Sequence, residues 1–114
     1  MKYLFIFNDS PYGSQRTYNG LRLAVALSKQ HSVRVFLLGD GVTAALSGLN
    51  PAHADYNPQE MLCQIAIRGV GIAVCRTCLE ARGISDELLI AEARRSTMDE
   101  LTAWSEETEK ILNF

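Results

Sequence analysis

The sequence is organised around residues 71–83, which read Gly71-Ile72-Ala73-Val74-Cys75-Arg76-Thr77-Cys78-Leu79-Glu80-Ala81-Arg82-Gly83. The run begins with apolar residues typical of a buried strand, and its first thiol falls where that strand ends and a turn begins. Thiol chemistry is therefore the sharpest functional signal in the chain. The Cys-x-x-Cys spacing alone is compatible with a redox pair, half of a metal site or two buried thiols.

Length and composition favour one ordinary globular domain. The 114 residues suit a single core, because compact domains commonly hold about 100 to 150 residues. Hydrophobic residues make up 47% of the chain and charged residues 21%, which argues against a disordered protein. We therefore expect a single domain over residues 1–114 that folds without metal or disulfide staples. Self-association would be an extra source of stability.

The charge pattern argues against two classes of partner. The 11 basic and 13 acidic residues are interspersed, whereas a nucleic acid or an anionic membrane usually requires a basic run. The apolar opening of the chain ends at Asn8-Asp9 without a small-residue cleavage site, which predicts a mature strand and no signal peptide. No apolar run approaches the roughly 20 residues that cross a bilayer. We expect a cytoplasmic protein with reduced cysteines, no nucleic-acid partner and no membrane partner.

Apolar runs alternate with helical patterns along the chain. Strands are predicted at 3–7, 33–38 and 71–74. A first helix is predicted after its cap at Ser14 and is broken at His31-Ser32. Further helices are predicted at 42–47 and 59–68, with an irregular loop at 50–58. Because parallel strands need crossover connections, this alternation implies an α/β fold, a mostly parallel sheet of about five strands covered by helices.

The pattern after Gly83 also predicts helices and strands. Ser85-Asp86-Glu87 is typical of a helix start, and a short fourth strand is expected within 89–95. Thr97 followed by Glu100 is a capping-box pattern, which predicts a helix that ends near Thr108. The last five residues predict a terminal strand, with buried side chains at Ile111, Leu112 and Phe114.

The loop at 8–14 is a second candidate part of the site. In a flavodoxin-like strand order the first and third strands are neighbours, and ligands bind outside their carboxyl ends. That order would place the loop beside Cys75, with its amides, Ser10 and Tyr12 lining the cysteine crevice. The loop has one glycine and so matches neither the dinucleotide fingerprint nor the P-loop.

A cysteine becomes a useful nucleophile when its surroundings stabilise the thiolate. If the segment after Cys75 is helical, its amides point toward the sulfur, and Arg76 or Arg82 adds positive charge while Glu80 opposes it. Cys78 would face the same side as Cys75, which permits a disulfide or a sulfur relay.

A zinc site, a thioredoxin-type active site and two buried core residues are the alternative roles for the two thiols. A zinc site needs further ligands, but Cys63 lies on a predicted helix, and His31 and His53 lie in separate loops. We therefore expect no metal, and we expect no cofactor. A thioredoxin-type oxidoreductase is disfavoured because no proline follows Pro58. Two buried small hydrophobic residues at a strand end remain an open alternative, since free cysteine is among the most buried residue types.

Short segments along the whole chain carry a further resemblance. They are Asn8-Asp9-Ser10-Pro11-Tyr12-Gly13-Ser14, Leu21-Arg22-Leu23-Ala24, Val35-Phe36-Leu37, Asp40-Gly41-Val42-Thr43-Ala44, Tyr56-Asn57, Cys75-Arg76-Thr77-Cys78 with Arg82-Gly83-Ile84, and Lys110-Ile111-Leu112-Asn113-Phe114. Together they make the chain similar to the DsrE-like family of small sulfur-handling proteins, and to its YchN-like branch in particular. The resemblance implies a flavodoxin-like three-layer α/β sandwich that assembles into trimers or hexamers.

The resemblance also implies a role for one cysteine. In sulfur-relay members a cysteine accepts sulfane sulfur as a persulfide and passes it to a partner protein. That cysteine precedes an Arg-Gly pair at the spacing that separates Cys75 from Arg82 and Gly83. Cys75 is thus the expected acceptor, and sulfur donor and acceptor proteins are the expected partners. Many relay members lack Cys78, whose role stays open between resolving a persulfide, relaying sulfur and supporting the site.

The leading hypothesis is a sulfur-transfer protein that carries a persulfide. Its expected catalytic residues are Cys75, Cys78 and Arg82, and its expected substrate-binding residues are Ser10, Tyr12 and Gly83. Two alternatives stay open: a homo-oligomeric binding or assembly protein, and a dithiol redox protein that uses both cysteines of the motif.

Overall fold

A computed structural model describes residues 1–49, 51, 56–69 and 71–114. Five residues of the predicted loop at 50–58, namely 50 and 52–55 with His53 among them, lie outside the described residues. The elements in chain order are β1 (Lys2–Phe7), α1 (Arg16–Ser28), β2 (Ser32–Leu37), the 3₁₀ helix η1 (Gly39–Ala45), α2 (Pro58–Ile67), β3 (Ile72–Cys75), α3 (Arg76–Ala81), the 3₁₀ helix η2 (Asp86–Leu88), β4 (Ala93–Ser96), α4 (Met98–Glu107) and β5 (Lys110–Asn113).

The strands form one parallel sheet. Its order is β4-β3-β2-β1-β5, and all four pairings are parallel. The predicted α/β fold with a parallel sheet of about five strands is confirmed. The expectation that the first and third strands are neighbours is wrong, because β2 lies between β1 and β3. Both strand orders produce the same alternation along the sequence, so the choice between them depends on tertiary packing.

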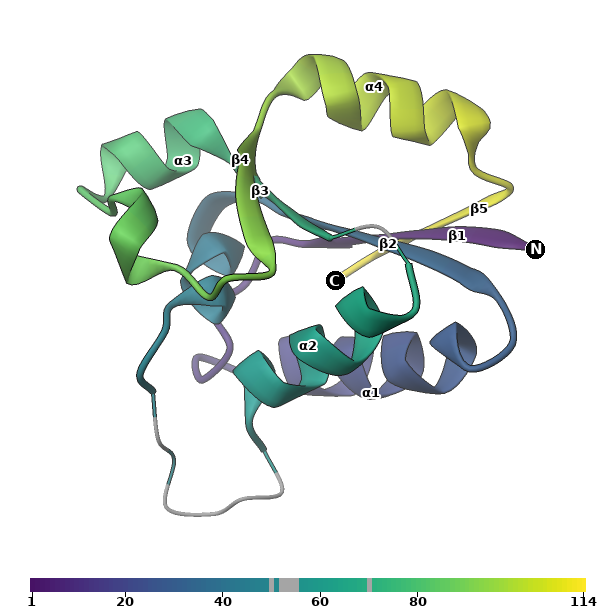
Figure 1. The fold of residues 1–114 in the computed structure, drawn as a ribbon, viewed down its shortest axis with the longest axis horizontal. Coiled ribbons are helices and arrows are strands. Elements are labelled where there is room, and N and C mark those ends of the chain that lie inside the picture. The colour runs from purple at the N-terminus through teal and green to yellow at the C-terminus, as the bar shows by residue number, and fades with distance from the viewer. Residues whose placement is uncertain (50, 52–55, 70) are drawn as a thin grey trace.

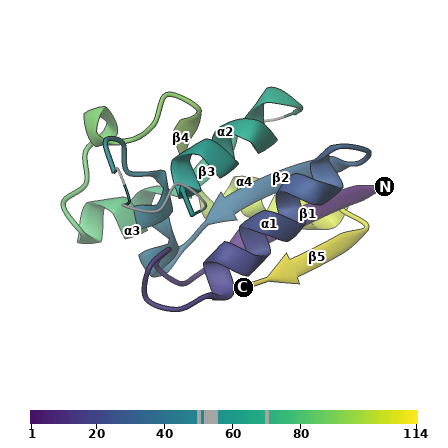
Figure 2. The ribbon, with the colours of Figure 1, turned by 90° about the horizontal axis from the view of Figure 1, so that it is seen from below.

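Helices cover both faces of the sheet. Figure 1 shows α1 and α2 together on one face and α4 on the other, and Figure 2 shows α1 and α2 from their own side. The order of the strands explains why both faces are covered. From β1 to β4 each strand lies next to the one before it in the same direction across the sheet. The chain then returns through α4 to place β5 on the other side of β1. Because crossovers keep one hand, a connection that runs in the reverse direction covers the opposite face.

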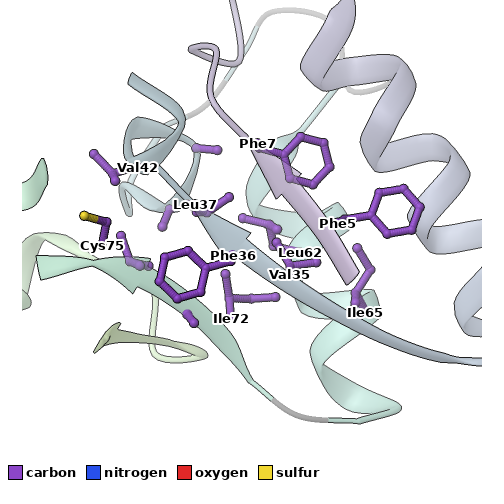
Figure 3. Packing of buried hydrophobic residues seen from close by; sticks show 14 of the residues in the cluster. Phe5, Phe7, Val35, Phe36, Leu37, Val42, Leu62, Ile65, Ile72 and Cys75 are labelled. Atoms are coloured by element: carbon purple, nitrogen blue, oxygen red, sulfur yellow. The ribbon is translucent and has the colours of Figure 1, made fainter. Parts of the chain in front are cut away.

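The core lies where the two helical layers meet the central strands. Phe5 and Phe7 of β1 stack with Phe114 at centroid distances of 5.9 and 5.7 Å. On the other face Phe36 meets the ring of Trp104 on α4 edge-on. Figure 3 shows Cys75 at the rim of this cluster, with its sulfur pointing away from the labelled apolar side chains. The core therefore fixes the backbone of Cys75 while leaving its sulfur at the edge of the sheet.

The second half of the chain brings two corrections. The helix start predicted at Ser85 yields only the short η2, and the fourth strand lies at Ala93–Ser96, at the end of the predicted window. Ile111 was expected to be buried, but it is 47% exposed. The reason is that β5 is an edge strand, so Ile111 has a neighbouring strand on one side only.

The predicted capping box is wrong in its bonding, although α4 does begin after Thr97. The Thr97 side chain makes no capping hydrogen bond. Glu100 instead accepts two hydrogen bonds from the Arg94 guanidinium, at 2.6 and 2.9 Å. These bonds hold the pKa of Glu100 below its ordinary value. A charged donor on β4 thus replaces the neutral backbone donor that the pattern predicted.

Gly41 is a position where the fold admits no side chain. A Cβ there would lie 2.2 Å from the carbonyl oxygen of Phe7. We expect Gly41→Ala to lower the free energy of unfolding by about 3 kcal/mol, because backbone cannot yield as a side chain can. Gly69→Ala is the matched control, since its Cβ would meet its nearest neighbour at 3.8 Å. Urea unfolding of both variants measures this, and equal stabilities would contradict the close approach of η1 to β1.

Candidate functional site

Cys75 stands at the junction between a strand and a helix. It is the last residue of β3 and the N-cap residue of α3. Its Sγ accepts a hydrogen bond from the Cys78 amide at 3.3 Å, so the sulfur occupies the position of a capping side chain. The residue is 8% exposed. The apolar run before it fills β3, and the loss of that pattern after Val74 lets the chain turn into α3.

Two further donors meet the Cys75 sulfur. The Thr77 hydroxyl lies 3.3 Å from Cys75 Sγ, and the Cys78 thiol donates to it with the two sulfurs 2.7 Å apart. Burial works to raise the pKa of Cys75, but hydrogen bonds from the Cys78 thiol, the Thr77 hydroxyl and the amides of both residues favour the thiolate. The net effect lowers the pKa of Cys75 from its ordinary value. Cys75 is therefore the thiol that ionises more readily.

Cys78 has the opposite character. Burial and the hydrogen bond it donates to Cys75 raise its pKa, and a hydrogen bond from the Gly39 amide, at 3.2 Å, counteracts this only in part. The two cysteines are both free thiols. The pair therefore combines a thiol inclined to ionise with one inclined to keep its proton.

Arg82 contacts the η1 turn. Its guanidinium donates to Asp40 Oδ1 at 2.8 and 3.2 Å, and to the carbonyl of Cys78 at 3.0 Å. Arg76 pairs instead with Glu80 at 3.8 Å. The sequence predicted that the positive charge of Arg76 or Arg82 would stabilise the Cys75 thiolate. In the structure, hydrogen bonds from Cys78 and Thr77 lower the pKa of Cys75 instead. Arg82 acts in this geometry as a positioning residue that fastens α3 to η1.

Gly83 ends α3 in the left-handed conformation, with a φ of +66°. Its amide donates to the carbonyl of Glu80, and the amide of Ile84 donates to the carbonyl of Leu79. This is the bonding of a Schellman motif, in which glycine is favoured because it has no Cβ. The Arg-Gly pair of the sequence thus has a structural basis here: one residue ties α3 to η1 and the next ends the helix.

Ser10 and Tyr12 lie in the loop that follows β1. The end of β2 separates this loop from Cys75. Ser10 and Asp40 line a hollow of about 230 Å³, and Tyr12 packs its ring 5.0 Å from that of Tyr56. Asp40 therefore has the 8–14 loop on one side and Arg82 on the other. The structure brings Cys75, Cys78 and Arg82 together, and it places Ser10 and Tyr12 after β1, two strands away from β3.

Three residues of the site were missed by the sequence interpretation. Thr77 lies inside the Cys-x-x-Cys motif, and its hydroxyl two residues after Cys75 could have been predicted to contact the sulfur. Gly39 and Asp40 follow β2, and only the correct strand order would have placed them beside the motif.

Cys63 is separate from this site. It lies on α2, and its thiol donates to Glu92 Oε1 at 3.0 Å. Burial and then the hydrogen bond to Glu92 raise the pKa of Cys63 to about 11. It is therefore a thiol of low reactivity at neutral pH and a natural internal control.

The fold and the site together define a small parallel α/β protein whose candidate reactive group is a thiol at the carboxyl edge of the sheet. Residues 1–114 match the DsrE/DsrF-like family, and the chain belongs to that family. The family includes sulfur-relay proteins such as TusC. The resemblance that the sequence motifs predicted is confirmed.

Known relatives cover the whole chain. Protein YchN of Escherichia coli K12 is 40% identical over 99% of this chain and 98% of that protein. A crystal structure of the E. coli ychN protein matches with a TM-score of 0.92 at 38% identity, covering 100% of this chain and 99% of that one. A protein named TusC homolog from Vibrio parahaemolyticus is 26% identical over 96% of both chains. Within the residues that the structure describes, no helix has the length and apolar character needed to span a membrane.

The Thr77 hydroxyl provides a direct test of the site. We expect Thr77→Val to slow alkylation of Cys75 by iodoacetamide at pH 7 by several-fold to about tenfold, the factor for a lost hydrogen bond of about 1 kcal/mol. Trypsin cleaves after Arg76 and so separates Cys75 from Cys78, which lets mass spectrometry follow each thiol. Thr102→Val, on the exposed surface of α4, is the control. An unchanged rate in Thr77→Val would remove the hydroxyl from the account.

Proposed function

We propose that this protein carries sulfane sulfur as a persulfide on Cys75 and passes it to an acceptor thiol. The observation that carries the proposal is the set of hydrogen bonds from Cys78 and Thr77 that meet the Cys75 sulfur at the start of α3. These hydrogen bonds lower the pKa of Cys75. A thiolate is the form of cysteine that attacks sulfur. We further propose that the protein works in the cytoplasm, where thiols are kept reduced.

Loading balances without an added oxidant. The Cys75 thiolate attacks the outer sulfur of a donor persulfide, a bond forms between the two sulfurs, and the bond from the outer sulfur to the donor breaks. The donor leaves as a thiolate with the electron pair. In the second half of the cycle an acceptor thiolate attacks the outer sulfur of the Cys75 persulfide, and Cys75 returns to its thiolate.

Cys78 has a specific place in this scheme. Its thiolate could attack the inner sulfur of a Cys75 persulfide, form the Cys75–Cys78 disulfide and release hydrosulfide. The raised pKa of Cys78 opposes that reaction, because it keeps the neighbouring thiol protonated. The proposal therefore gives Cys78 two roles: it donates a hydrogen bond to the reactive sulfur, and it discharges the persulfide only slowly.

The second candidate function is that of a dithiol redox protein. The 2.7 Å separation of Cys75 and Cys78 sulfurs favours it, since a disulfide between them would need only a small movement. In that case the pair would cycle reversibly between dithiol and disulfide with a two-electron potential near the cytosolic range. The chain would then not hold a persulfide for longer than the disulfide takes to form.

Self-association into a trimer or hexamer is part of the proposal. Apolar side chains on the described surface support it, and Ile67 on α2 is the largest example at 82% exposed. In the proposed assembly another copy of this chain covers such side chains. The proposed partners beyond other copies of this chain are a sulfur donor and a sulfur acceptor.

A persulfide assay tests the proposal. After incubation of the reduced protein with inorganic polysulfide, we expect one added sulfur on the tryptic peptide that ends at Arg76 and contains Cys75. The added sulfur should be absent in Cys75→Ser, retained in Cys63→Ser, and lost more slowly in Cys78→Ser than in the wild type. The dithiol alternative predicts instead a Cys75–Cys78 disulfide with no lasting persulfide.

The assembly of the variants completes the same experiment. Cys75→Ser should sediment as the same trimer or hexamer as the wild type, because Cys75 contributes its sulfur to the site and not to a surface. Absence of added sulfur on wild-type Cys75 would contradict sulfur transfer, and absence of the Cys75–Cys78 disulfide as well would leave a binding or assembly role.

A further inference from the structure

A cavity of about 300 Å³ lies beside the cysteine site. Its walls come from the start of α3, with Arg76 and Thr77, and from the β4–α4 junction, with Ser96, Thr97, Met98 and Asp99. The parallel pairing of β3 and β4 sets Cys75 directly opposite Ser96. The cavity is therefore placed by the same two strands that position the thiol.

Thr77 connects the cavity with the reactive sulfur. It lines the cavity, and its hydroxyl lies 3.3 Å from Cys75 Sγ. A molecule held in the cavity is thus one side chain away from the thiol with the lowered pKa. A volume of about 300 Å³ is at the lower end for ligand pockets, which suits a small molecule better than a macromolecule.

The charges of the walls define what the cavity can hold. One wall includes Arg76, a cation, and the other includes Asp99, an anion. Arg76 is more than half exposed, and its 3.8 Å pair with Glu80 is a weak surface contact. A ligand can therefore replace that pair at little cost, since the guanidinium binds carboxylates well.

Uncharged hydroxyls complete the lining. Thr97 makes no capping hydrogen bond to α4, which leaves its hydroxyl for a ligand. A site with one cation, one anion and hydroxyls is complementary to a zwitterion. It is less suited to a dianion such as thiosulfate, because the Asp99 carboxylate would repel the second negative charge.

We propose that this cavity binds a zwitterionic small-molecule hydropersulfide, an α-amino acid that carries a perthiol, as the sulfur donor to Cys75. Arg76 binds the carboxylate of the donor, and Asp99 binds its ammonium group. The inference rests on the proposed function, and it assigns that function a substrate class. The Cys75 thiolate attacks the outer sulfur, the sulfur–sulfur bond of the donor breaks, and the amino acid leaves as its thiolate with the electron pair.

Three donors of one chemical series test the charge complement. Cysteine hydropersulfide has both charged groups, N-acetylcysteine hydropersulfide lacks the ammonium group, and cysteamine hydropersulfide lacks the carboxylate. We expect wild-type Cys75 to gain sulfur from the first about fivefold to tenfold faster than from either of the others, the factor for one charge-assisted hydrogen bond at a partly exposed site. Fragmentation of the labelled peptide locates the added sulfur.

Two variants assign the charges to residues. Asp99→Asn should abolish the preference over N-acetylcysteine hydropersulfide and keep the preference over cysteamine hydropersulfide. Arg76→Gln should do the reverse. Because each readout is a ratio between donors, a change in the Cys75 thiolate population cancels. Glu106→Gln, on α4 away from the cavity, is the control, and thermal unfolding checks the loss of an acidic first-turn residue in Asp99→Asn.

The outcomes separate the two proposals. Equal rates from the three donors, faster loading from thiosulfate, or preferences unaltered in both variants would overturn the zwitterion site and leave the persulfide function standing. No loading of Cys75 from any donor would overturn both.

Discussion

The site depends on hydrogen bonds that converge on one sulfur atom. Cys75 ends β3, and its Sγ accepts hydrogen bonds from the Cys78 amide, the Cys78 thiol and the Thr77 hydroxyl. These donors exist in the required place because the chain turns into α3 directly after the strand. Burial alone would favour the neutral thiol, so the first turn of α3 decides the ionisation of Cys75.

The position of α3 depends in turn on the end of β2. The Gly39 amide donates a hydrogen bond to the Cys78 sulfur, and the Arg82 guanidinium donates one to Asp40. Gly39 has a φ of +53°, and Gly41 leaves no room for a side chain against Phe7. The backbone after β2 is therefore held against β1 on one side and against the cysteine turn on the other. A short loop without catalytic side chains of its own becomes the support of the thiol.

Much of the fold was predictable because local patterns determine it. The apolar runs of β1, β2 and β3, and the turn after Cys75, follow from residue type and spacing, and the cysteine motif stood out for the same reason. The strand order was not predictable in this way, since β2 between β1 and β3 is a matter of packing. That one error moved the 8–14 loop next to Cys75 in the prediction, whereas Gly39 and Asp40 hold that place. The hydrogen bonds of Glu100 were also not predictable from local pattern, because their donor is Arg94 on β4 and not the backbone at the start of α4.

Of the two thiols, Cys75 is the one that ionises more readily, and Cys78 is the one that keeps its proton to higher pH. The most direct measurement is a pH titration of the β-carbon chemical shifts in protein labelled with ¹³C-cysteine, with Cys63→Ser used to simplify assignment. We expect Cys75 to ionise first, with a pKa below the ordinary value of a thiol, and Cys78 to ionise later, with a pKa above it. Ionisation of Cys78 first, or of both thiols together at the ordinary value, would contradict this expectation.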